Sequence, residues 1–477
     1  MIIYVILGII LAFLLTVVSR ALLFNPKDTI VENSESIEFD GDRAVETLTE
    51  LVKCKTVSYN DKSLEDNSEF EKLENLLPKL FPNVFKVMSF QKLPDRALLF
   101  KWEGKNSEAP AVLMSHYDVV PASEEDWEKP AFEGIIEDGV LWGRGTLDTK
   151  VTMNAALSAA EHLIKKGFVP ENDIYLAFSG GEEVNGHGAI NIVNYFEANG
   201  ITPAIVVDEG GGVVQNVFPG VKEPCALIGI AEKGMINVEY KTLSSGGHAS
   251  APKPKTPIGT ISKACIRVEK HPFKSHLTKP VAEMFDTLGR HSTFPLKLIF
   301  ANLWCFKWVL DIICRKTGGE MNALMRTTVA FTQMKGSQAR NVIPSEAVMV
   351  SNLRLNPCDT VKSGIEYLRK TVKDESVTVT AIEGNNPSPI SETNCEAWNR
   401  ISSTVAETWA GSIVSPYLMV QCSDSRHYGK ISDHVYRFSA MALTNEERAT
   451  IHGHNERITL DAIKKSVEFY IRLILKS

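Results

Sequence analysis

The chain has 477 residues, of which 44% are hydrophobic, and this length allows two or three ordinary globular domains. Its formal net charge of −7 and its pI near 6.0 argue against a nucleic-acid-binding surface. Its eight cysteines are scattered without a CxxC pair, which argues against a small disulfide framework and against a cysteine-ligated zinc site.

The N-terminus is strongly apolar. Residues Met1 to Ser19 carry no charged side chain, and Arg20 follows them. Such a run can just span a bilayer. A cleaved signal peptide is the competing interpretation, but no basic residue precedes the run and the run is long for a signal sequence. The pattern therefore favours a membrane anchor over residues 1–24, with a secreted or lumenal protein as the alternative.

A polar linker over 25–43 leads into alternating apolar strands and helical patterns. Residues 109–120, 172–183 and 201–211 each combine a buried strand with a following loop, and 150–167 has the pattern of a helix. Strand, helix and strand in this spacing predict an α/β domain with a mainly parallel sheet. We assign 44–231 and 385–477 to this domain.

Residues 232–384 have a different pattern. Strand-like alternation at 234–244, 327–336, 347–355 and 376–384 surrounds two helical segments, 257–270 and 361–374. This predicts a smaller inserted α+β domain made of an antiparallel sheet and two helices.

One segment of the insertion, Phe294 to Lys316, is very apolar and carries Trp304 and Trp308. Its interspersed polar residues indicate an amphipathic helix rather than a second membrane span. Packing within the protein, a dimer contact, or a surface facing an acyl chain or a membrane would each account for it.

Histidines and carboxylates gather where the predicted strands end. His116 and Asp118 point to the same face of an extended chain, so they can converge on one metal, with the aspartate orienting the histidine. Further candidates lie at corresponding positions later in the chain: Asp148, Glu182, Glu183, Asp208, Glu209, His452 and His454. Taken alone, each cluster of polar residues is typical of a loop exposed to solvent. Together they form a nitrogen and oxygen ligand set suited to zinc and large enough for two ions.

The motifs HYDVVPA, GRGTLDTK, SGGEE, DEGG, GGHAS, RNVIP and DSRHY, followed by a histidine and the pair NE, occur in an order that resembles a known family. This family is the dinuclear zinc amidohydrolases of the M20 type, which include aminoacylase and carboxypeptidase S. The resemblance covers about residues 45–477. The apolar N-terminus and the NLWCFKW segment bring it closest to carboxypeptidase S and the N-fatty-acyl-amino-acid synthase/hydrolases.

The resemblance implies roles for the clustered residues. Asp148 would bridge two zinc ions, with a strained peptide bond after it at Asp148–Thr149. His116 and Glu209 would complete one site, and Glu183 and His452 the other. Asp118 would orient His116, and Glu182 would be the general base. Asp208 and His454 are the competitors of Glu209 and His452, which match the family motif better.

Three residues of the inserted domain, with Arg426 of the α/β domain, would complete the site. His248 resembles a histidine that stabilises the oxyanion, from a partner subunit in dimeric relatives. Asn341, Arg354 and Arg426 resemble positions that contact substrate, and an arginine suits bidentate capture of a carboxylate. The stretch QCSDSRHY lacks the glycine and threonine that usually precede this aspartate, which leaves the shape of that edge of the pocket open.

The resulting expectation is a zinc hydrolase that cleaves the amide next to a free amino-acid carboxylate. Its substrate would be a short peptide, a long-chain N-acyl amino acid or a short-chain one, and the reverse synthesis would use the same site. The inserted domain would serve as a lid or a homodimer contact. A non-catalytic, membrane-tethered binding protein is the alternative of another class, and a single metal, cobalt or manganese is the alternative cofactor.

Overall fold

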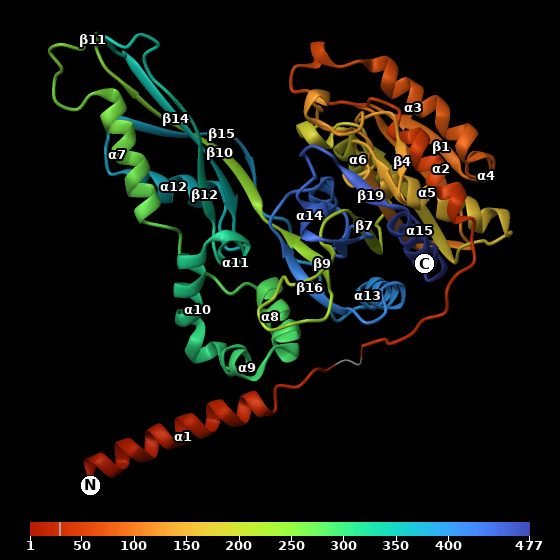
Figure 1. Ribbon diagram of the computed structural model, residues 1–477, viewed down its shortest axis with the longest axis horizontal. Coiled ribbons are helices and arrows are strands. Elements are labelled where there is room, and N and C mark those ends of the chain that lie inside the picture. The colour runs from red at the N-terminus through yellow and green to blue at the C-terminus, as the bar shows by residue number, and fades with distance from the viewer. Residues whose placement is uncertain (28–29) are drawn as a thin grey trace.

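A mixed ten-stranded sheet forms the centre of the larger domain in the computed structural model, which describes residues 1–27 and 30–477 (Figure 1). Its strands follow the order β1-β2-β6-β3-β7-β17-β9-β8-β18, and β16 pairs with β9 off this path. The strands are β1 (Ser89–Leu93), β2 (Ala97–Trp102), β3 (Asn106–His116), β6 (Asn172–Ser179), β7 (Ile205–Asp208), β8 (Gly212–Val214), β9 (Cys225–Glu232), β16 (Ile413–Met419), β17 (Val435–Arg437) and β18 (Ala442–Leu443).

The sheet, predicted to be mainly parallel, is mixed, with parallel pairing among its central strands and antiparallel pairing on both sides of them. Strands β6, β3, β7 and β17 are parallel neighbours, whereas β1, β2 and β6 pair antiparallel, as do β17, β9 and β8. Only a short turn that contains Asp95 and Arg96, both with positive φ, joins β1 to β2. A connection of this length permits only an antiparallel pair.

Helices cover both faces of this sheet, because its central strands alternate their apolar side chains between two cores. Leu113 of β3 belongs to the core beneath α5 (Lys150–Lys165) and α15 (Leu460–Leu475), whereas Val112 belongs to the core beneath α6 (Gly188–Ala198). The first core also takes up side chains of α2 (Gly41–Val52), α3 (Asn67–Leu80), α4 (Pro82–Val87) and α13 (Glu396–Thr408). Because the central strands are parallel, their carboxyl ends meet at one edge of the sheet, where ligands usually bind in such folds.

A second sheet is antiparallel, with the order β12-β14-β10-β15. Side chains of β10 and β14 alternate between buried and partly exposed, and the buried ones pack under α7 and α12. Its elements are β10 (Gly234–Leu243), α7 (Pro257–Lys270), β12 (Thr328–Lys335), β14 (Glu346–Leu355), α12 (Val361–Val372) and β15 (Val377–Asn385). A two-stranded ribbon of β11 (Gly247–His248) and β13 (Val342–Ile343) lies at its outer tip (Figure 1).

Four helices that lie between α7 and β12 in the sequence pack on the larger domain. They are α8 (Lys279–His291), α9 (Phe294–Phe300), α10 (Leu303–Thr317) and α11 (Gly319–Met325). Phe285, Phe300 and Leu310 share a core with Leu227 of β9 and Tyr417 of β16. The apolar segment predicted as one amphipathic helix is thus two helices, α9 and α10, with a corner at Ala301 and Asn302.

The N-terminal helix α1 (Ile2–Leu22) projects from this helical group (Figure 1). By length and composition it is the one helix among the described residues that could cross a membrane. Most of its side chains are exposed, but Val17 and Ala21 are buried at 5% and 1% exposure. Its last turns are therefore part of the packed structure.

The remaining elements are short. Strands β4 (Ile135–Glu137), β5 (Val140–Trp142) and β19 (Arg457–Thr459) form a small sheet, and α14 (Asn445–Arg448) follows β18. The 3₁₀ turns are η1 (Lys62–Leu64), η2 (Glu124–Asp126), η3 (Glu182–Val184) and η4 (Asp424–Lys430). All eight cysteines are free thiols.

Candidate metal centre

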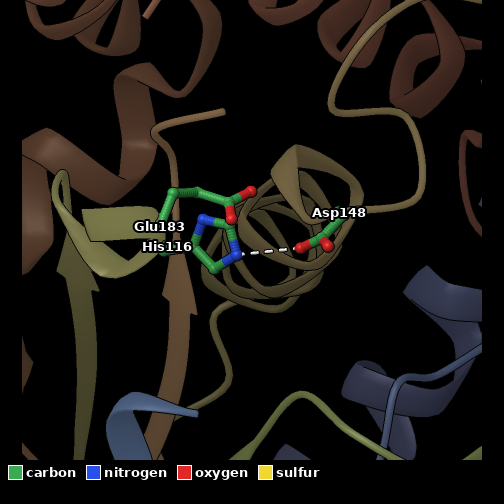
Figure 2. Close-up of side chains that lie close together, drawn as sticks. All are labelled: His116, Asp148 and Glu183. Carbon is green, nitrogen blue, oxygen red and sulfur yellow. Dashed lines mark hydrogen bonds and ion pairs between the residues drawn. The ribbon is translucent and has the colours of Figure 1, made fainter. Parts of the chain in front are cut away.

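His116 is the last residue of β3 and is buried. Its Nδ1 lies 3.0 Å from the backbone carbonyl oxygen of Asp118 and 3.4 Å from the Asp118 Oδ1. The shorter contact fixes the ring so that Nε2 points away from the strand, toward Asp148 (Figure 2). Asp118 thus lies in the predicted position beside His116, although its carbonyl makes the closer contact.

The carboxylate of Asp118 is engaged on both oxygens. Its Oδ1 accepts the backbone N–H of Glu182 at 3.1 Å, and its Oδ2 accepts that of Glu183 at 3.2 Å. The Ser58 hydroxyl also donates to Oδ2, at 2.6 Å. This one carboxylate therefore links the histidine to the turn that carries both glutamates.

Asp148 lies between two histidines, in the loop just before α5. Its Oδ1 is 2.9 Å from Nε2 of His116, and its Oδ2 is 3.0 Å from Nε2 of His452. Nε2 of His116 is also 3.3 Å from Oε1 of Glu209, and Nε2 of His452 is 3.2 Å from Oε2 of Glu183. The five predicted ligands thus form two histidine–carboxylate groups that share Asp148. The peptide bond between Asp148 and Thr149, where the resemblance implies an unusual bond, is cis.

Glu456, to which sequence analysis assigned no role, holds the loop that carries Asp148. Its carboxylate is fully buried and accepts the backbone N–H groups of Gly145, Leu147 and Asp148 at 2.7 to 3.1 Å. The buried Arg144 guanidinium lies 2.6 Å from Glu456 Oε2. Glu456 is the last residue of the motif that contains His452, so the sequence did mark it as a candidate. Only the fold shows that it contacts the GRGTLD loop.

The ligand atoms fit a metal ion. Those of His116, Asp148 and Glu183 all lie within 4.8 Å of one another, and so do those of His116, Glu182 and Glu209. In the described chain, Oε1 of Glu183 is buried without a hydrogen-bond partner. A buried carboxylate oxygen without a partner is costly, and a cation would satisfy it. Imidazole and carboxylate donors together suit zinc.

Burial and mutual contact shift the titration of this cluster. Burial raises the pKa of Glu209 to about 8 and raises that of Glu182 well above its ordinary value. The hydrogen bond with Asp148 raises the pKa of His452 to about 10. Without a metal, therefore, Glu209 and His452 both carry protons at pH 7.

We expect a divalent ion to displace these protons when it binds. At pH 7, zinc binding to the metal-free chain should release protons, because ligands coordinate in their deprotonated forms. The release should fall as the pH rises past 8, where Glu209 has already lost its proton, and should fall again near 10 for His452. Titration calorimetry in buffers of different ionisation enthalpy measures the number released. Equal release at pH 7 and pH 9.5 would contradict this expectation.

The competing ligand candidates lie elsewhere. Asp208 is buried, and its Oδ2 accepts the backbone N–H of Ser425 at 2.9 Å. His454 is exposed, two residues beyond His452. The geometry therefore favours Glu209 and His452 as the residues that face Asp148 and its partners.

The predicted substrate residues fall into two groups. His248 and Asn341 are exposed and lie side by side at the tip of the small sheet, where the backbone N–H of Ala249 donates to the Asn341 carbonyl. That tip is at the opposite end of the small sheet from β7 and α14, which flank the cluster (Figure 1). Arg354 and Arg426 lie nearer, since Arg354 donates to the Cys422 sulfur at 3.3 Å and Arg426 to Asn185 at 3.1 Å.

A cavity of about 600 Å³ adjoins the cluster. Its polar end is formed by Asp148, Glu182, Glu183, Glu209 and His452, next to Cys422. Its other walls are largely apolar, with Arg448 and Glu320 among the few charged side chains, and include Val213, Val214, Val217, Leu227, Tyr417, Met419, Met441, Leu443 and Ile451. The volume and the lining are those of a small-molecule site.

Comparison with known proteins agrees with this geometry. Residues 112–476 match the model of peptidase family M20/M25/M40. The chain is 33% identical to a probable carboxypeptidase S-like 2 of Dictyostelium discoideum, covering 98% of this chain and 92% of that protein. It is 34% identical to an N-fatty-acyl-amino acid synthase/hydrolase PM20D1 of Xenopus tropicalis, covering 93% and 88%.

Solved structures show the same fold. An M20 family metallo-carboxypeptidase from Sulfolobus solfataricus superimposes with a TM-score of 0.64 at 18% identity, over 91% of this chain and 98% of that one. The family match and the two relatives, each more than 30% identical over most of the chain, support the same assignment. The chain is a hydrolase that belongs to peptidase family M20/M25/M40.

Proposed function

We propose that this protein uses two zinc ions to hydrolyse the amide bond between an acyl group and an amino acid with a free carboxylate. Asp148 would bridge the ions, His116 and Glu209 would hold one, and Glu183 and His452 the other. The observation that carries this proposal is the position of Asp148, whose two carboxylate oxygens each face a different histidine. A single bound ion would leave one of these two groups without a function.

Bound zinc supplies Lewis acidity to the amide carbonyl and lowers the pKa of water. Glu182 would act as the general base, since it lies in the cavity close to His116 and Glu209 and the ligands of this scheme are other residues. It would take a proton from the attacking water and deliver it to the leaving amine. The Asp118 carboxylate positions Glu182 and Glu183 together through their backbone N–H groups.

Arginines would orient the substrate. Arg354 and Arg426 both lie close to Cys422, which lines the cavity, so a carboxylate near the polar end would be within reach of either. A guanidinium binds a carboxylate through two parallel N–H donors. The carboxylate of the amino acid would thus be held at this edge while its amide faces the ligand cluster.

The apolar walls favour a long acyl chain. They include Val217 and Tyr417, and the cavity of about 600 Å³ is larger than a short acetyl group fills. Burying apolar surface contributes about 0.8 kcal/mol per methylene. The printed names of the relatives include an N-fatty-acyl-amino acid synthase/hydrolase, which agrees with this substrate class.

A competition assay tests the substrate. With zinc supplied, the full chain in detergent should release phenylalanine from N-oleoyl-phenylalanine faster than it releases methionine from N-acetyl-methionine or leucine from glycyl-leucine. Val217→Trp should narrow the cavity and lower kcat/KM for the oleoyl substrate roughly tenfold, a loss of about 1.4 kcal/mol. It should change kcat/KM for the acetyl substrate much less.

Val169→Trp is the matched control, because Val169 is exposed and lies outside the cavity lining. It should leave both substrates unaffected. Preference for glycyl-leucine would instead favour a carboxypeptidase, the second candidate, whose support is the carboxypeptidase S-like relative.

The segment 232–384 would act as an inserted domain, as predicted from its strand pattern. His248 lies at the exposed tip of the small sheet, away from the cluster of its own chain (Figure 1). A homodimer formed through this domain would allow it to reach the site of a second copy. This arrangement is the role that the resemblance implies for His248 in dimeric relatives.

The N-terminal helix would be retained as a membrane anchor. Arg20 and Ala21 pack against the folded chain, and the Arg20 guanidinium donates to the Ala301 carbonyl at 3.0 and 3.1 Å. A signal peptide that is removed has no such contacts to make in the mature protein. Detection of Met1–Leu22 peptides in the mature protein by mass spectrometry would support retention.

A further inference from the structure

The corner between α9 and α10 packs against the side of α1. Asn302 donates its side-chain N–H to the Val17 carbonyl at 3.0 Å, one turn before the contact between Arg20 and Ala301. Farther along, the rings of Phe13 and Trp304 meet edge to face, with centroids 6.0 Å apart. These contacts hold α10 at a fixed position beside the part of α1 between Phe13 and Arg20.

The outer face of α10 is apolar and uncovered. Trp304 is 62% exposed, Trp308 is 64% exposed and Ile312 is 43% exposed. They are four residues apart, so they form one line along the helix. On the inner face, Leu310 and Cys314 are buried in the core shared with the larger domain.

The direction of α10 suits a helix that lies flat on a bilayer. In Figure 1, α10 runs across the direction of α1 rather than along it. A helix perpendicular to a membrane span lies in the plane of the membrane. Phe13 is about 10 Å along α1 from Arg20, at 1.5 Å per residue. If Arg20 stays at the polar boundary, the Trp304 ring reaches below it.

Charges agree with this orientation. Lys307, Arg315 and Lys316 of α10 are exposed. Helices that lie in the membrane interface combine tryptophan and aliphatic side chains on one face with basic residues beside them. Tryptophan is enriched at the interface between membrane and water.

We propose that α10 is an interfacial membrane helix, inserting Trp304, Trp308 and Ile312 into the bilayer beside the anchor. The inference rests on the anchor assigned to α1 under the proposed function, and it goes beyond that assignment by placing part of the enzyme domain itself in the lipid. The occupant of this face is lipid rather than a second copy of the chain, because the face is continuous with α1, whose own surface is almost entirely uncovered.

Tryptophan quenching by brominated lipid tests the inference on the full chain. Trp304 and Trp308 are the exposed tryptophans, whereas Trp102 and Trp127 are buried and Trp142, Trp398 and Trp409 are partly buried. Bromine placed on the acyl chains of phosphatidylcholine vesicles should quench a substantial share of the fluorescence, relative to unbrominated vesicles. The double variant Trp304→Phe/Trp308→Phe should lose most of that bromine-dependent share.

Trp142→Phe is the matched control, since Trp142 lies on β5 beneath Arg457, and it should keep the bromine-dependent share. Flotation of the same vesicles reports the anchor, and hydrolysis of the oleoyl substrate reports the enzyme. Chains that float with vesicles but show no bromine-dependent quenching would overturn the inference and leave the anchor standing. Chains that do not float would overturn both. Equal quenching in the double variant and the wild type would also overturn the inference, whatever the activity.

Discussion

Glu182→Gln should leave the metal content of the protein unchanged while lowering kcat by roughly 10²–10⁴-fold, the range expected for loss of a general base. An amide cannot accept the proton that a carboxylate takes from water, but it has nearly the same shape. The backbone N–H of residue 182 still donates to Asp118, so the turn should stay in place. The measurement is zinc per chain by elemental analysis, together with steady-state hydrolysis of an N-acyl amino acid.

Glu125→Gln is the control for this substitution. It makes the same chemical change at an exposed position in η2, outside the cavity lining. Its zinc content and kcat should match those of the wild type. If Glu182→Gln lost zinc as well as activity, Glu182 would be a ligand, which its distance to His116 and Glu209 also permits. If it kept full activity, the proposed mechanism would be wrong.

Asp148→Ala should abolish high-affinity zinc binding at both positions. Among the described residues, Asp148 is the one carboxylate that contacts both His116 and His452, so its removal deprives each group of a ligand. At a free zinc concentration 1,000 times the dissociation constant, each bound ion stabilises the wild-type fold by about 4 kcal/mol. The variant should gain almost none of this, so zinc should raise the Tm of the wild type and leave that of the variant nearly unchanged.

Asp126→Ala, on the exposed η2 turn, is the control, and zinc should raise its Tm as it does for the wild type. Retention of two zinc ions by Asp148→Ala would show that Asp148 does not bridge. Retention of one would assign the remaining ligands to a single independent site. Thermal unfolding with and without zinc, paired with elemental analysis, separates these results.

The sequence was informative where local pattern determines local structure. Runs of apolar residues predicted β3, β6 and β7, and the polar residues at their ends predicted a common edge, because parallel strands end on the same side. His116, Asp148 and Glu209 meet there. The order of motifs supplied the roles that single clusters could not.

Other features depend on contacts between distant segments. Glu456 is more than 300 residues from the Asp148 loop in the sequence, and a periodic pattern of apolar residues cannot predict a contact of that kind. The antiparallel edge of the sheet depends on the turn at Asp95 and Arg96, both with positive φ, a conformation that aspartate adopts more readily than arginine. The division of the apolar segment into α9 and α10 depends on α1, because Asn302 at the corner bonds to Val17.

The packing of α1 against α9 holds α1 in a fixed position relative to the larger domain. Phe24, just beyond α1, lies under the guanidinium of Arg290 of α8, at 4.3 Å, and Ala21 belongs to the same core as Leu227 and Tyr417, which line the cavity. An expression product that starts after residue 24 would lose part of this core as well as the helix. Detergent-solubilised full-length protein is therefore the better starting material. Loss of α1 should loosen the packing of Leu227 and Tyr417 in the wall of the cavity.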